Sequence, residues 1–285
     1  MARFSSTERR FGRFRTRLLS ADNGAGDART VIMFHGWSDS ADTWKPLMRE
    51  LWNDGARLLA VDLPGFGRAD PAAPGLQLPQ LIDFVHAVLV ELGPTTGQLY
   101  PVGQSLGART MLTAVARGVG VPIPVAFAVG PAPLELPGWQ RVLVRNGSLA
   151  PAVSRIAEDQ SDAQRIREVV NSYKRSCFAE PDKVPDEVYA DYASHLTPAR
   201  AATHIEALRL IGVELAQPLA LSSIDCPVEI AWGALDRMAP ISGAEAYLRA
   251  IPDARLHRYE GAGHHAHLER STEIAALIRS HLPGI

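Results

Sequence analysis

Short apolar runs alternate with amphipathic segments along most of this chain, and the alternation predicts its fold class. Thr30–His35 (TVIMFH) and Arg57–Val61 (RLLAV) are almost continuously apolar, as expected of strands that are covered on both faces of a sheet. Further strand-like runs lie at Leu99–Val102, Pro124–Val129 and Val228–Trp232, and two more polar ones lie near Phe14–Leu19 and at Arg255–Tyr259. We expect each of these runs to form a strand.

Segments with helical spacing of apolar residues separate these runs. In Pro79–Leu92 the apolar side chains recur every three or four positions, and Gly93-Pro94 marks the end of the helix. Similar patterns predict helices at Asp42–Asp54 (with Asp42 as the N-cap), Ser105–Arg117 and Ser271–Leu282. Strands that alternate with helices of this length predict an α/β fold, with a mostly parallel, doubly wound sheet.

The alternation stops between about Pro133 and Pro218. This interval is polar and helix-rich, with Ser154–Tyr173 as its clearest helical stretch. We interpret it as a helical insertion, so that residues 1–132 and 219–285 form the two parts of one core and residues 133–218 lie between them.

Two local features depart from a simple alternation. Pro101 falls inside a predicted central strand, where a missing N–H is unusual, and we expect it to require a bulge. The arginine-rich N-terminus lacks the apolar segment of a secretory signal, and we interpret it as a short tail before the first strand, with its arginines in solvent.

Composition and charge limit the classes of protein to consider. The 285 residues include 29 lysines and arginines against 31 aspartates and glutamates, a balance that does not favour nucleic acid as a partner. The longest uncharged run, Gly118–Leu134, contains four prolines and is too short to span a bilayer. Cys177 and Cys226 form no disulfide framework, so we expect a cytoplasmic protein.

The strongest chemical signal is the pentapeptide Gly103-Gln104-Ser105-Leu106-Gly107. It follows a predicted strand and begins a predicted helix, which is the context that gives a G-x-S-x-G pattern its meaning. Gly103 and Gly107 let the strand and helix approach closely, and the sharp turn presents the Ser105 hydroxyl at the carboxyl edge of the sheet.

A serine nucleophile needs a base, and the base needs an orienting carboxylate. His264 and Asp236 each follow a predicted strand downstream, in the order Ser, Asp, His. His265 and His267 are alternative bases, for which we favour packing or hydrogen-bonding roles. The competing acids are Asp39, Asp42 and Asp62. No H-E-x-x-H pattern is present, so we expect no metal.

These motifs together resemble the alpha/beta hydrolase fold superfamily over nearly the whole chain. The likeness extends to His35-Gly36-Trp37 after an early strand and to Asp62–Gly67 (DLPGFG). It implies an oxyanion hole made by the backbone N–H groups of Trp37 and Leu106, supported by the His35-Gly36 loop. It also implies that the 133–218 insertion is a cap over the site.

The function expected from this pattern is hydrolysis of a small acyl substrate, a carboxylic ester or lactone, through an acyl-enzyme and without a cofactor. Serine at position 105 argues against relatives that resemble epoxide hydrolases, which use aspartate. Hydrolysis of a C–C bond in a dicarbonyl-like compound is an alternative. A ligand receptor on a hydrolase scaffold is a third possibility, and the sequence leaves the substrate and the oligomeric state open.

Overall fold

The computed structural model describes residues 2–26, 28–75, 77–134, 175–184, 204, 207, 210–212, 214–215 and 219–283. The predicted helical stretch Ser154–Tyr173 lies outside these residues. The proposed limits of the insertion therefore stay predictions.

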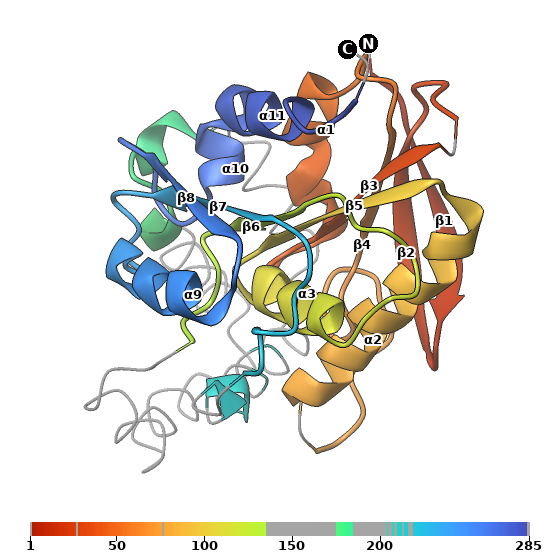
Figure 1. Ribbon diagram of the computed structural model, residues 1–285, viewed down its shortest axis with the longest axis horizontal. Helices are drawn as coiled ribbons and strands as arrows, with labels where there is room; N and C mark the ends of the chain where they lie inside the picture. The colour runs from red at the N-terminus through yellow and green to blue at the C-terminus, as the bar shows by residue number, and fades with distance from the viewer. Residues whose placement is uncertain are drawn as a thin grey trace, which may run out of the picture.

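A twisted sheet forms the centre of the described chain (Figure 1). It has eight strands in the order β1-β2-β4-β3-β5-β6-β7-β8, and all pairs are parallel except β1–β2 and β2–β4. The strands are β1 Phe4–Phe11, β2 Phe14–Ala21, β3 Arg29–Phe34, β4 Arg57–Val61, β5 Gln98–Gln104, β6 Ala126–Val129, β7 Val228–Gly233 and β8 Ala254–Tyr259. This arrangement confirms the predicted α/β class with a mostly parallel sheet.

Helices cover both faces of the sheet (Figure 1). The α-helices that lie wholly within the described residues include α1 Lys45–Glu50, α2 Gln77–Leu92, α3 Leu106–Ala116, α9 Ala244–Ala250, α10 Ala266–Glu269 and α11 Ser271–Arg279. Short 3-10 turns lie at η1 Ala41–Trp44, η2 Gly93–Thr95, η3 Pro181–Lys183 and η4 Ile241–Gly243. Helices α2, α3 and α9 contribute to one apolar cluster, and α1 and α11 contribute to the other.

The two clusters explain the continuous apolar runs. Along β3, Ile32 and Phe34 belong to the cluster with α2 and α3, whereas Val31 and Met33 belong to the cluster with α1 and α11. Successive side chains of a strand point to opposite faces, so a strand between two helical layers buries every position.

The N-terminal interpretation as a tail was wrong. Residues Phe4–Phe11 form β1, which pairs along its full length with β2. All of its central side chains are exposed because it is the edge strand, so it shows no apolar alternation that could have identified it. The expectation of solvated arginines also fails at Arg17, whose side chain is 6% exposed.

The segment predicted as one helix from Asp42 to Asp54 is shorter and begins differently. A 3-10 turn over Ala41–Trp44 precedes α1, which ends at Glu50. Ser40, not Asp42, is the N-cap, and its hydroxyl oxygen accepts the N–H of Asp42. Asp42 instead pairs with two cations described below.

Pro101 does not cause the expected bulge. The register of β5 with β3 runs through it without an inserted residue, from Tyr100 opposite Val31 to Val102 opposite Met33. Pairing of β5 with β6 begins only at Val102. The missing N–H is tolerated because β5 has a neighbour on one side only at that point.

Candidate active site

The backbone at Ser105 forms a sharp turn between β5 and α3. Ser105 has φ 51° and ψ −115°, in the left-handed half of backbone space that side chains rarely adopt. A Cβ on Gly103 would lie 2.5 Å from the Cα of Ala108, and one on Gly107 would clash with the carbonyl of Phe34. Both glycines therefore permit the close contacts that the turn requires.

The structure brings Ser105, His264 and Asp236 together in one chain of hydrogen bonds. His264 Nε2 lies 2.9 Å from Ser105 Oγ, and His264 Nδ1 lies 2.7 Å from Asp236 Oδ2. An ionised carboxylate can only accept, so Nδ1 carries the proton and Nε2 accepts the hydroxyl proton of Ser105. The Ser105 side chain does not cap α3 and is available for this contact.

Asp236 is itself fixed by backbone donors. Its second oxygen, Oδ1, accepts the N–H groups of Met238 at 2.9 Å and Ala239 at 2.8 Å. The carboxylate therefore keeps one oxygen for His264. The three residues follow β5, β7 and β8, whose carboxyl ends meet at one edge of the sheet.

The His35-Gly36-Trp37 loop lies beside the serine. A Cβ on Gly36 would lie 3.2 Å from the Cβ of Ser105 and would overlap the Gln104 side chain. Leu106 is the first residue of α3, and first-turn N–H groups have no partner within their helix. The loop and the helix start that carry the two predicted oxyanion donors, Trp37 and Leu106, thus both adjoin Ser105.

His35 braces this loop from within the core. Its Nε2 accepts the N–H of Leu63 at 2.9 Å, so the proton lies on Nδ1, which donates to the carbonyl of Gly36 at 2.8 Å. Burial lowers the pKa of His35, and this effect is larger than the opposing effect of the Asp62 charge. The ring is therefore neutral and supports the loop rather than exchanging protons.

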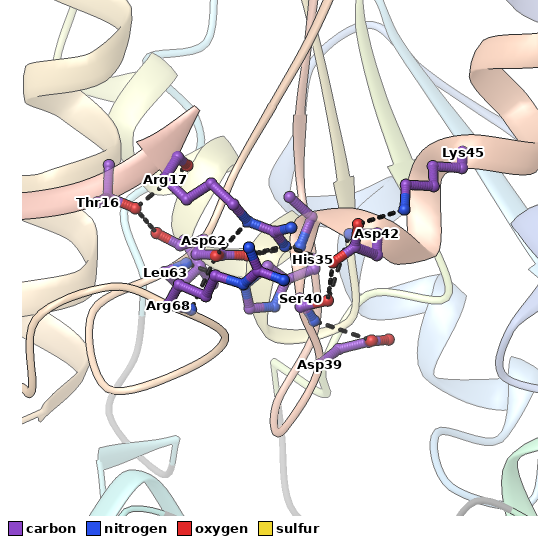
Figure 2. A network of polar contacts seen from close by, with 11 residues as sticks. Thr16, Arg17, His35, Asp39, Ser40, Asp42, Lys45, Asp62, Leu63 and Arg68 are labelled. Atoms are coloured by element: carbon purple, nitrogen blue, oxygen red, sulfur yellow. Dashed lines mark hydrogen bonds and ion pairs between the residues drawn. The ribbon is translucent and has the colours of Figure 1, made fainter. Parts of the chain in front are cut away.

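A buried ion-pair network anchors the other end of the loop (Figure 2). The guanidinium of Arg17 contacts Asp62 at 2.8 Å and Asp42 at 2.6 Å, and Lys45 contacts Asp42 at 2.7 Å. Asp62 also accepts the backbone N–H of Ala41 at 2.7 Å. Burial opposes the charge on Arg17, but the two carboxylates outweigh it and raise its pKa. Asp42 and Asp62, two of the competing acids, are therefore engaged in structural contacts.

Sequence reasoning missed three residues around the site. Gln104 is 1% exposed, and its amide donates to the carbonyl of His264 at 3.2 Å. Gly130, with φ +46°, leaves a gap in which a Cβ would lie 3.3 Å from Asp236 Oδ2. The backbone carbonyl of His204 accepts the indole N–H of Trp37 at 3.0 Å. Nothing marked these roles in the sequence, because Gln104 and His204 act through backbone groups of distant segments and Gly130 acts through its missing side chain.

The neighbouring histidines make other contacts, although the His265 ring lies edge-on to that of His264, with ring centroids 5.8 Å apart. His267 Nε2 contacts the hydroxyl of Thr43 at 3.0 Å, and the His265 ring stacks on that of His267. His265 Nδ1 lies 3.9 Å from Asp39, the third competing acid. Among the described residues no group of three or more His, Cys, Asp or Glu side chains is arranged to hold a metal ion.

Within the described residues, every helix is too short or too polar to cross a membrane.

Comparison with known proteins identifies the family of this chain. The model of the alpha/beta hydrolase family matches residues 31–277. The chain belongs to this family, as its motifs predicted.

Individual relatives differ in their reactions. Over 91% of its length the chain is 27% identical to the dihydrolipoyllysine-residue acetyltransferase component of an acetoin cleaving system from Cupriavidus necator, and it spans only 65% of that protein. It is 24% identical to a 2-hydroxy-6-oxononadienedioate/2-hydroxy-6-oxononatrienedioate hydrolase from a Pseudomonas species, covering 92% of this chain and 90% of the relative. It is 23% identical to monoacylglycerol lipase abhd6-A from Xenopus laevis, and the match covers 91% of this chain and 77% of the relative.

A solved structure supports the fold. The 2-hydroxy-6-oxo-6-phenylhexa-2,4-dienoate hydrolase from Rhodococcus superposes with a TM-score of 0.74 at 19% identity, covering 100% of both chains. At this identity the likeness concerns the fold alone.

Proposed function

We propose that this protein is a serine hydrolase that cleaves a carboxylic ester or lactone through an acyl-enzyme. The observation that carries the proposal is the hydrogen-bond chain from Asp236 through His264 to a serine hydroxyl on a strained turn. A hydroxyl becomes nucleophilic when a neighbouring neutral imidazole accepts its proton, and the carboxylate fixes the tautomer that can do so.

The geometry supports the following sequence of steps. Ser105 Oγ forms a bond to the acyl carbon while His264 Nε2 takes its proton. The carbonyl oxygen becomes an oxyanion, which the N–H groups of Trp37 and Leu106 bind. Collapse breaks the bond to the leaving oxygen, which receives the proton from His264.

The second half regenerates the enzyme. His264 takes a proton from water as the water oxygen attacks the acyl carbon, and the tetrahedral intermediate then releases the carboxylic acid and Ser105. Asp236 stabilises the imidazolium in both halves.

A small-molecule substrate and a cytoplasmic location are parts of the same proposal. Cys177 and Cys226 are both buried and are not joined to each other by a disulfide, which supports a reducing compartment. No step requires a metal or an organic cofactor.

A C–C bond hydrolase is the second candidate. The relative from Pseudomonas, named for a dienedioate substrate, aligns with nearly all of the chain and favours this reaction. The monoacylglycerol lipase relative favours the ester reaction instead. Both reactions place the same serine and histidine beside a carbonyl carbon, so the site alone does not separate them.

The test is the turnover of p-nitrophenyl acetate and butyrate by the native chain and by Ser105→Ala. We expect the variant to lose at least about a thousandfold in kcat. Ser6→Ala, on the exposed strand β1, serves as the matched control and keeps full activity. Equal rates for the native chain and Ser105→Ala would overturn the proposal.

A parallel panel of 2-hydroxy-6-oxo-dienoates separates the two candidates. Higher kcat/KM for the dienoates than for the esters would replace the ester assignment by the C–C reaction.

A further inference from the structure

A segment distant in the sequence lies directly against the loop that carries His264. The N–H of His264 donates to the carbonyl of Cys177 at 2.6 Å. The contact is so close at the preceding residue that a Cβ on Gly263 would lie 2.6 Å from the same carbonyl and 2.7 Å from the N–H of Ala179. Residues Cys177–Ala179, which belong to the predicted insertion, thus pack against the loop that carries His264. We call this loop, residues 260–265, the histidine loop.

One carboxylate joins the two segments. Glu269, at the end of α10, accepts the N–H of Gly263 at 2.7 Å through Oε2 and the N–H of Ala179 at 2.8 Å through Oε1. Burial raises the pKa of this carboxyl, and the backbone donors oppose that effect. The side chain is therefore shared between the residue before His264 and the residue that follows Cys177–Phe178.

This arrangement has a consequence for His264. The Ser105–His264 distance depends on where the loop lies, and proton transfer falls steeply with small displacements of the reacting groups. The side-chain contacts of His264 reach Asp236 and Ser105. Its backbone is held at the carbonyl by Gln104, at the N–H by Cys177 and, at the preceding residue, by Glu269.

We propose that Glu269 is a positioning residue, which binds segment Cys177–Ala179 to the histidine loop and thereby holds His264 at Ser105. The inference rests on the proposed function, in which His264 is the base. It assigns to residues Cys177–Ala179 of the proposed insertion a role in placing the catalytic histidine.

The two variants Glu269→Gln and Glu269→Ala test this role. Glutamine keeps one acceptor oxygen and loses the other, whereas alanine loses both. We expect kcat for p-nitrophenyl acetate to fall about tenfold in Glu269→Gln and further in Glu269→Ala, with KM within about twofold of the native value, because transition-state geometry and not substrate binding is affected. The rate of serine labelling by a fluorophosphonate is expected to fall in the same order.

Glu273→Gln, on the exposed side of α11, is the matched control and should match the native enzyme in both assays. Thermal unfolding of each variant identifies a purely structural effect. A lower Tm with unchanged kcat, or a loss of kcat/KM that lies entirely in KM, would overturn the inference. If Glu269→Ala does not fold, Glu269→Gln alone decides. A native chain that neither turns over esters nor accepts the label would instead refute the proposed function.

Discussion

At the scale of single residues, the space around the acid–base pair depends on a glycine. Gly130 follows β6 with a positive φ, and the position of its missing Cβ lies 3.3 Å from Asp236 Oδ2 and 3.4 Å from His264 Nδ1. A methyl group there would press on the pair from one side, at a separation tighter than most contacts of its kind.

We therefore predict that Gly130→Ala lowers kcat/KM for p-nitrophenyl esters at least about tenfold, since it displaces His264 or Asp236. Gly118→Ala is a matched control, because Gly118 also has a positive φ and nothing lies within 4 Å of its Cβ position. Both variants lose about 1 kcal/mol from backbone strain in chemical denaturation. If the two variants have equal activity, the assigned packing at Gly130 is wrong.

His35 makes a second prediction at this scale, on stability. Its pKa is lowered by burial, so below the ordinary value of about 6.5 the unfolded chain binds a proton that the folded chain does not. The contribution of His35 to the free energy of unfolding is thus complete above about pH 6.5 and declines as the pH falls below it.

Urea unfolding at pH 7.5 and pH 5.5 measures this contribution. Replacing His35 by glutamine should reduce stability at pH 7.5 and make the loss on acidification smaller than in the native chain. Ser6→Ala, on the exposed strand β1, removes no titratable group and is the control, which should keep the native pH dependence. An unchanged slope in His35→Gln would contradict the assignment.

At the scale of elements, the network around Arg17 connects strand β2 to the loop beside the serine. Its guanidinium lies between Asp62 and Asp42, and all three side chains are buried. Removing one member of a buried ion pair leaves an uncompensated charge, which costs more than the pair contributed.

Arg17→Met should therefore lower the free energy of unfolding by about 3–5 kcal/mol. Arg15→Met is the control two residues away on the same strand, where the pairs with Glu8 and Asp70 are exposed and contribute about 1 kcal/mol or less. Chemical denaturation of both variants checks the difference. Losses of the same size would show that burial does not set the strength of this network.

The sequence predicted the elements best where both faces are buried. The runs at β3, β4 and β7 were found because continuous apolar residues identify a central strand. Strand β1 was missed since an exposed edge carries no such pattern. Helix α9 was missed too, and the segment at Ala41–Trp44 was assigned to a helix because tertiary contacts of Asp42 are invisible in a local pattern.

At the scale of the whole molecule, the sheet topology explains why distant residues meet. Parallel strands end at one edge, so residues after β5, β7 and β8 converge whatever their separation in the chain. This is why Ser105, Asp236 and His264 were predictable from motif and strand order. Gln104 was harder to assign, because its role depends on a backbone group of another segment.

The central claim is that Ser105 is activated by His264 and Asp236, and covalent labelling tests it without knowledge of the substrate. The native chain is incubated with a fluorophosphonate and the modified peptide is identified by mass spectrometry. We predict a single adduct on Ser105, and a labelling rate that falls about a thousandfold or more in His264→Gln and in Asp236→Asn. Labelling at another residue, no labelling, or a His264→Gln rate equal to the native rate would contradict the account.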